Sequence, residues 1–191
     1  MIDIISDVAF ERVQLVLHGI PGAAEKAFYG IISRATTSMK ASSVKDITEV
    51  YDIKATEVRS GSNTAIKTKT KKVDGGVIGT IQYSGTQIPL IRFGVSHRQP
   101  KSGRMVRARQ RRDRGKTAFT NAYIANLGRG VGIFERATSR RASSVQIMGV
   151  STAQMAGDSG VLDRAEKAAQ ETIVKRTEHE ISRIIQGYLG R

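Results

Sequence analysis

The 191-residue chain has no cysteine, no tryptophan, only three prolines and 5% aromatic residues. Without cysteine, a disulfide scaffold, thiol catalysis and a cysteine-ligated zinc site are excluded. The histidines His18, His97 and His179 lie in three separate segments and do not have the spacing of a metal-binding motif. We therefore expect no metal site and no cofactor.

Long apolar runs are also missing. The longest candidate, AFYGII, is far shorter than the roughly 20 residues that cross a bilayer. The first residues, MIDIISD, are acidic and lack the basic and apolar regions of a secretory signal. We expect no membrane contact and no secretion by that route.

Positive charge is abundant and unevenly distributed. The chain carries a net charge of +14, and residues 54–141 hold 20 Lys and Arg against four Asp and Glu. The sharpest concentration is the segment 98–116, called the basic arm below, with nine cations and Asp113 as its one acid. Such a segment attracts polyanions. Its cations are Arg98, Lys101, Arg104, Arg107, Arg109, Arg111, Arg112, Arg114 and Lys116.

The basic arm has no regular hydrophobic period and contains Pro100 and Gly103, so we expect a long exposed loop between two strands. Three interpretations of its charge remain open: contact with nucleic acid, contact with an acidic protein, or a solvated loop. No residue inside the arm can stack on bases, which favours the duplex backbone over single strands.

A second basic group alternates along residues 66–71, where Lys67, Lys69 and Lys71 would point to one side of a strand, about 7 Å apart. Such a row can follow a phosphate backbone. It can equally protect an edge strand from unwanted pairing, which is the commoner use of strand lysines.

Helical periods occur at both ends of the chain. Apolar residues recur through 24–39 after Pro21, a shorter helix is expected before them, and another after Ser43. The same period returns at 161–188.

A period of two dominates the centre. The runs 65–73 and 77–85 flank Asp74-Gly75-Gly76 and predict a hairpin, a third run follows at 87–95, and 118–127 with 131–137 predict a second hairpin. We therefore expect an α+β fold in a single domain spanning 1–191. It would have N-terminal helices, a central antiparallel sheet carrying the basic arm as a long loop, and a C-terminal helix packed on the sheet.

Catalytic motifs do not stand out. Gly128-Arg129-Gly130 lacks the rest of a phosphate-binding loop and is interpreted as a turn. No G-x-S-x-G motif occurs. A metal-dependent nuclease would need clustered carboxylates, and the centre offers only the scattered Asp74, Asp113 and Glu135. We expect a protein that is not an enzyme.

The order of these features resembles the minor tail protein Z family of tailed bacteriophages. The resemblance covers most of residues 10–189. It is carried by RATTSMKASS, EVYDIKATEV, the strand IPLIRF before the basic arm, AFTNAYIANLGRGVGIFERAT and the closing helix.

The resemblance implies a structural virion protein that is assembled in the host cytoplasm. It would act as a tail-completion or neck subunit at the head-proximal end of the tail, in a homo-oligomeric ring, commonly a hexamer. Its partners would be other tail or neck proteins and the genomic double-stranded DNA in the channel. The alternative from the residues alone is a free-standing double-stranded DNA-binding protein without sequence preference.

Overall fold

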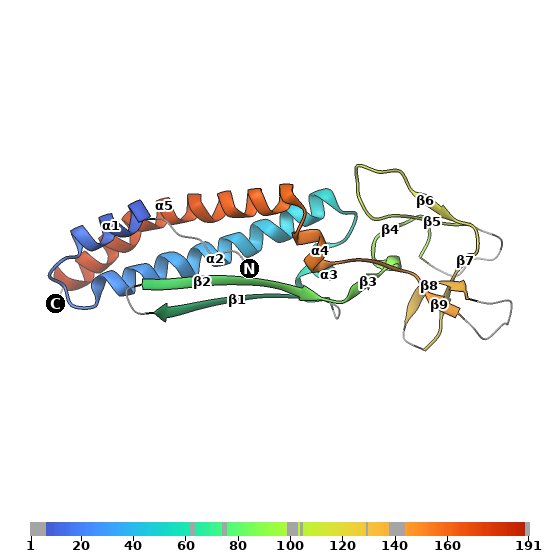
Figure 1. Ribbon diagram of the computed structural model, residues 1–191, viewed down its shortest axis with the longest axis horizontal. Helices are drawn as coiled ribbons and strands as arrows, with labels where there is room; N and C mark the ends of the chain where they lie inside the picture. Colours follow the sequence, from blue (N-terminus) through green and yellow to red (C-terminus); the bar gives the residue numbers. More distant parts are fainter. Residues whose placement is uncertain are drawn as a thin grey trace. The chain divides into compact units, whose positions relative to one another are not determined.

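The fold was described from a computed structural model, which describes residues 7–61, 64–73, 76–98, 103, 105–128, 130–137 and 144–189. In chain order, helices come before and after a series of strands, which are labelled in Figure 1. The predicted α+β class, with N-terminal helices and a C-terminal helix on an antiparallel sheet, is confirmed.

Contacts group the chain into two compact units. The first contains Met1–Ser43, Ile66–Gln82 and Ser159–Arg191, and the second contains Val44–Ala65 and Tyr83–Asp158. One long helix and two strands contribute residues to both units. The single domain expected from the length therefore remains a prediction, since elements shared in this way are compatible with folding as one.

The first unit is built on three helices, α1 (Asp7–Val16), α2 (Ala23–Val50) and α5 (Ser159–Leu189). The apolar stripe predicted along α2 is buried, and α5 buries a matching stripe. Many of these buried residues are alanines, which allow helices to approach closely. Phe10 and Phe28 pack edge to face, with ring centroids 4.8 Å apart. The core is formed mainly by Val13, Leu17, Ala27, Ile31, Ile32, Ala35, Met39, Val161, Ala165, Ala169 and Ile173.

The separate helix predicted after Ser43 is wrong, because α2 continues without a break to Val50. Ser43 does not begin a new helix. Its hydroxyl donates a hydrogen bond to the Met39 carbonyl oxygen at 2.7 Å, four residues earlier in the same helix.

Strands β1 (Thr64–Val73) and β2 (Gly76–Gly85) form the predicted hairpin, a two-stranded sheet that lies along α2 (Figure 1). Gly79 permits this close approach. A Cβ atom there would lie 2.5 Å from the Thr36 side chain and 2.6 Å from that of Ile32.

The second unit contains the remaining strands and two short helices. Helix α3 (Ala55–Ser60) follows α2, and α4 (Thr152–Ala156) begins with a capping box in which Ser151 and Gln154 bond reciprocally. The strands are β3 (Gln87–Pro89), β4 (Gly94–Val95), β5 (Val106–Arg109), β6 (Thr117–Phe119), β7 (Ala122–Asn126), β8 (Val131–Arg136), β9 (Ser144–Gln146) and β10 (Met148–Ser151), with the 3-10 turn η1 (Leu90–Arg92) after β3.

These strands pair antiparallel in three small sheets, β10-β3, β4-β5-β6 and β7-β8-β9, within the described residues. The second predicted hairpin is β7 with β8. Phe93 and Ile133 are fully buried in this unit.

The basic arm is not irregular throughout. Residues 106–109 form β5, which pairs with β4 on one side and β6 on the other. Val106 and Ala108 are buried, whereas Arg107 is exposed and Arg109 is half-buried. The expectation of a long exposed loop is therefore wrong for this stretch, because Val106 and Ala108 alternate with the arginines and are buried in a strand.

Candidate polyanion-binding surfaces

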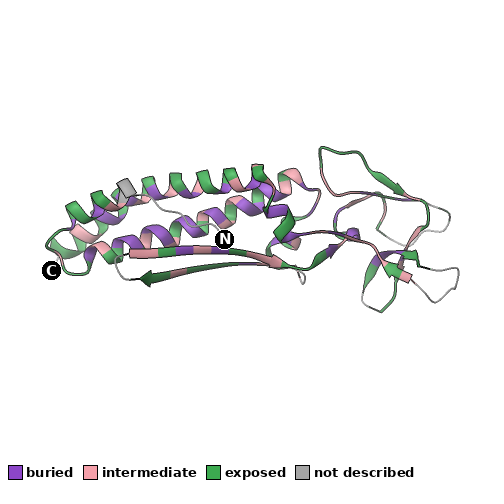
Figure 2. Cartoon of the chain, viewed as in Figure 1, coloured by how far each residue is buried: buried purple, intermediate pink, exposed green. Residues whose placement is uncertain are grey.

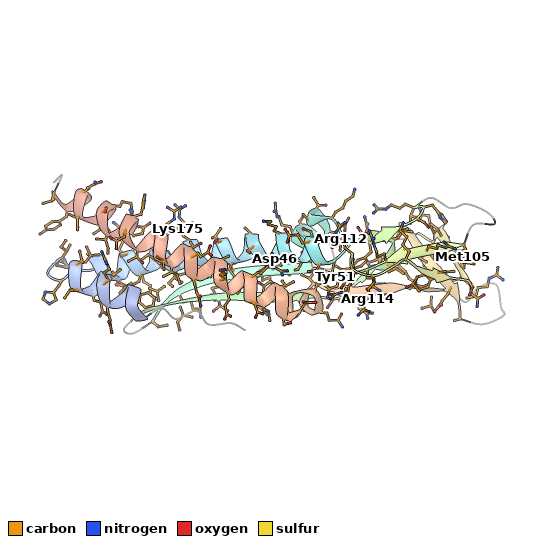
Figure 3. The ribbon with its side chains drawn as sticks, turned by 90° about the horizontal axis from the view of Figure 1, so that it is seen from above. Asp46, Tyr51, Met105, Arg112, Arg114 and Lys175 are labelled. Carbon is orange, nitrogen blue, oxygen red and sulfur yellow. The ribbon has the colours of Figure 1, made fainter. Side chains whose placement is uncertain are left out.

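Three arginines of the basic arm are bound to carboxylates of the same unit. The set formed by Arg109, Arg111 and Arg112 with Asp52, Asp113 and Asp158 is called the arginine clamp below. Arg109 at the end of β5 and Arg111 and Arg112 just after it lie near the end of α2, where Tyr51 and Asp52 follow. Figure 3 labels Tyr51, Arg112 and Arg114 in this region.

Asp52 binds two arginines. The Arg109 Nε and Nη2 atoms donate to Asp52 Oδ2 at 2.9 and 2.7 Å, and Arg112 Nη1 lies 3.3 Å from Asp52 Oδ1. The Asp52 side chain is only 18% exposed, so its negative charge depends on these partners. Arg112 also donates from Nε to the Thr48 carbonyl oxygen at 2.9 Å.

Arg111 has the most completely satisfied guanidinium in the clamp. Its Nη1 donates to Asp158 Oδ2 at 2.6 Å, its Nε to Asp113 Oδ1 at 3.1 Å, and its Cζ lies 5.3 Å from the centre of the Tyr51 ring. The hydrogen bond with Asp113, followed by that with Asp158, raises the pKa of Arg111 above its ordinary value. The same hydrogen bond from Arg111 lowers the pKa of Asp113.

Backbone hydrogen bonds hold the clamp in register. The Asp52 amide donates to the Gln110 carbonyl oxygen at 2.7 Å, and the Arg112 amide donates to that of Val50 at 2.8 Å. This part of the arm is thus attached to the end of α2, and three of its positive charges are compensated by three negative ones.

The other cations predicted for the arm differ in their surroundings. Arg98 donates to the Phe93 carbonyl oxygen at 3.3 Å, and Lys101 and Arg104 lie outside the described residues. Arg107, Arg114 and Lys116 are exposed, and none of them forms a side-chain hydrogen bond or ion pair with another described residue. These three are the free arm cations.

The three alternating lysines, called the lysine row below, lie on strand β1, as their spacing in the sequence predicted. Lys67, Lys69 and Lys71 are exposed on β1 and have no ion pair with any other residue that the structure describes. Their neighbour Lys72 pairs with Glu25 of α2 at 2.8 Å. Figure 2 shows β1 as predominantly exposed.

The residues considered for metal binding are not brought together. Over the described ranges, no group of three or more His, Asp or Glu side chains has the geometry to hold a metal ion. Asp113 is engaged by Arg111, Glu135 is exposed on β8, and Asp74 lies outside the described residues.

Asp52 and Asp158 are the site residues that sequence reasoning missed. They lie 57 and 47 positions from the arginines that they bind. Nothing in the sequence distinguishes them from the other acids on either side of the basic centre.

None of the helices in the described ranges combines the length and apolar character needed to span a membrane. In comparisons with known proteins, no family model, no curated protein and no solved structure matches the chain.

Proposed function

We propose that the chain is a non-enzymatic structural subunit of a tailed bacteriophage. It would form a ring at the head-proximal end of the tail, as a tail-completion or neck protein, and contact the channel DNA or adjoining rings. The order of sequence features along residues 10–189 supports this proposal. The observation that carries it is the exposed positive charge that remains after the arginine clamp has neutralised part of the arm.

The free arm cations are the part of the arm suited to an external polyanion. They are exposed and have no ion pair with another described residue. The clamp arginines, by contrast, would have to break their ion pairs with Asp52, Asp113 or Asp158 before they could bind another anion. A ring multiplies a modest charge on each subunit, so weak contacts can act together. We therefore narrow the predicted contact from the whole arm to these free cations.

The second candidate function is a free-standing protein that binds double-stranded DNA without sequence preference. The exposed lysine row favours it, because a monomer with such a row needs no ring to attract a polyanion. The two functions differ in oligomeric state.

The test is mass photometry and negative-stain imaging of the purified full-length chain, followed by imaging of phage particles that carry a tagged copy. We expect a closed ring, with six copies the leading stoichiometry, and the tag at the head–tail junction. A monomer that binds duplex DNA would transfer the assignment to the free-standing binding protein. A chain that neither forms a ring nor binds DNA would contradict both functions.

A matched pair of variants separates assembly from DNA contact. Neutralising the free arm cations, as Arg107→Gln, Arg114→Gln and Lys116→Gln, should leave the ring intact and weaken duplex binding, because the variant keeps the clamp. Loss of the ring with unchanged duplex affinity would instead assign these cations to contacts between subunits.

A further inference from the structure

The β1–β2 hairpin has two unlike faces, and the inner one packs on α2. Ile66 of β1 is only 5% exposed and Ile81 of β2 only 2% exposed. Lys72 lies on the same side of β1 as Ile66, since its ammonium group lies 2.8 Å from the carboxylate of Glu25 of α2, in a pair whose side chains are 56% and 50% exposed. Gly79 has no space for a Cβ atom against Thr36.

The outer face follows from the alternation of side chains along each strand. Inward Ile66 and Lys72 place Lys67, Lys69 and Lys71 on the opposite side of β1, where all three are exposed. On β2 the same argument places Ile78, Thr80 and Gln82 outward, and the apolar Ile78 is 46% exposed. These six outward residues are called the lysine face below.

The lysine face has no negative charge of its own. Neither β1 nor β2 contains an Asp or Glu, and the one hairpin lysine that has a carboxylate partner is the inward Lys72. The result is three ammonium groups in a line that have no carboxylate partner among the described residues, with an uncharged hydrogen-bonding side chain at Thr80 and another at Gln82. In the arginine clamp, by contrast, each arginine meets a carboxylate.

We propose that the lysine face binds the phosphate backbone of double-stranded DNA without reading its sequence. A line of charges about 7 Å apart suits a linear, regularly charged polyanion. The face has no aromatic residue to stack on unpaired bases, which favours a duplex over a single strand. That the DNA is the DNA in a phage channel rests on the proposed function. That the lysine face attracts a phosphate backbone does not depend on it.

Protection of an exposed strand edge is the competing explanation for these lysines. It predicts that their loss causes association between copies of the chain and leaves DNA binding unchanged. The two explanations therefore differ in a measurable way.

The experiment compares two triple variants of the full-length protein with the same change in net charge. Lys67→Gln, Lys69→Gln and Lys71→Gln remove the row, and Lys26→Gln, Lys167→Gln and Lys175→Gln remove three exposed lysines from helices of the same unit. Binding to a fluorescent 20-base-pair duplex is measured by anisotropy between 50 and 200 mM salt, with circular dichroism as the check on folding.

Three phosphate contacts contribute about −2.7 to the slope of log affinity against log salt, or about 40-fold in affinity across this range. We expect the row variant to lose this contribution and the helix variant to keep it. Equal slopes in both variants, or no duplex binding by the wild-type chain, would overturn the proposal. So would tighter binding to a single strand of equal length.

Two further results would reassign the face. Aggregation of the row variant with an unchanged slope would establish edge protection in its place. If the row variant lost the binding of the wild-type chain to phosphatidylserine vesicles but retained duplex binding, the partner of the lysine face would be a lipid surface. Failure of this proposal is distinct from failure of the proposed function. If the protein is a monomer but the two triple variants differ in salt slope, the ring is contradicted and DNA binding by the lysine face is supported. If the protein forms a ring but the variants have equal slopes, the ring is supported and DNA binding by the lysine face is contradicted.

Discussion

The arginine clamp and the lysine face are both strongly basic in sequence, yet their charges meet different surroundings. In the clamp, Arg109, Arg111 and Arg112 lie against three carboxylates and are bound to the end of α2. On the lysine face, three ammonium groups share one exposed side of β1, and neither β1 nor β2 contains an acidic residue. Positive charge that is compensated within the fold stabilises it, and charge that is not compensated is available to a partner.

The largest expected effect comes from removing the shared acid of the clamp. Asp52→Asn would leave Arg109 without its charged partner at a poorly exposed position, which should lower the free energy of unfolding by about 2 kcal/mol. Urea unfolding measures this effect. The control is Glu49→Gln, because Glu49 is exposed and its pair with Lys45 spans 3.8 Å, so we expect a loss below about 0.5 kcal/mol.

The same Asp52 variant also tests whether compensation keeps the clamp away from polyanions. Arg109 and Arg112 should become available, so the salt slope of duplex binding should become steeper by up to about 1.8. Wild-type stability in the Asp52 variant would show that the clamp does not hold the arm in place.

A smaller effect separates two neighbouring lysines on opposite faces of β1. Lys71→Gln should reduce the magnitude of the salt slope by about 0.9, because one phosphate contact is lost from the lysine face. Lys72→Gln should leave the slope unchanged and cost less than about 0.5 kcal/mol of stability through its exposed pair with Glu25. Equal changes in slope for both variants would mean that total charge matters and the face does not.

The smallest expected effect is a change in the pH dependence of stability. Because Arg111 lowers the pKa of Asp113 in the folded state, this pair stabilises the fold above the pKa of the unfolded side chain, near 4. The stabilisation is lost as pH falls through the lower, folded pKa. Asp113→Asn should therefore make the urea midpoint less sensitive to pH below about 4. An unchanged pH profile would remove Asp113 from the clamp.

Much of the fold could be predicted because its signals are local. The stripe along α2, the hairpin of β1 and β2, and the long closing helix each follow from a period in the chain. Strand β5 was missed, since only Val106 and Ala108 mark its buried side and arginines surround them. The unbroken course of α2 was missed because Ser43 has the chemistry of a cap but uses its hydroxyl inside the helix.

The candidate site was likewise predictable only in part from the sequence. The amino-acid order by itself determined that the centre is basic and that Lys67, Lys69 and Lys71 share a side, because composition and alternation need no distant contacts. Only the tertiary structure decided which cations are neutralised, since Arg109 and Arg111 meet Asp52 and Asp158 across 57 and 47 residues of chain. The strength of an ion pair depends on distance in space, and folding sets that distance.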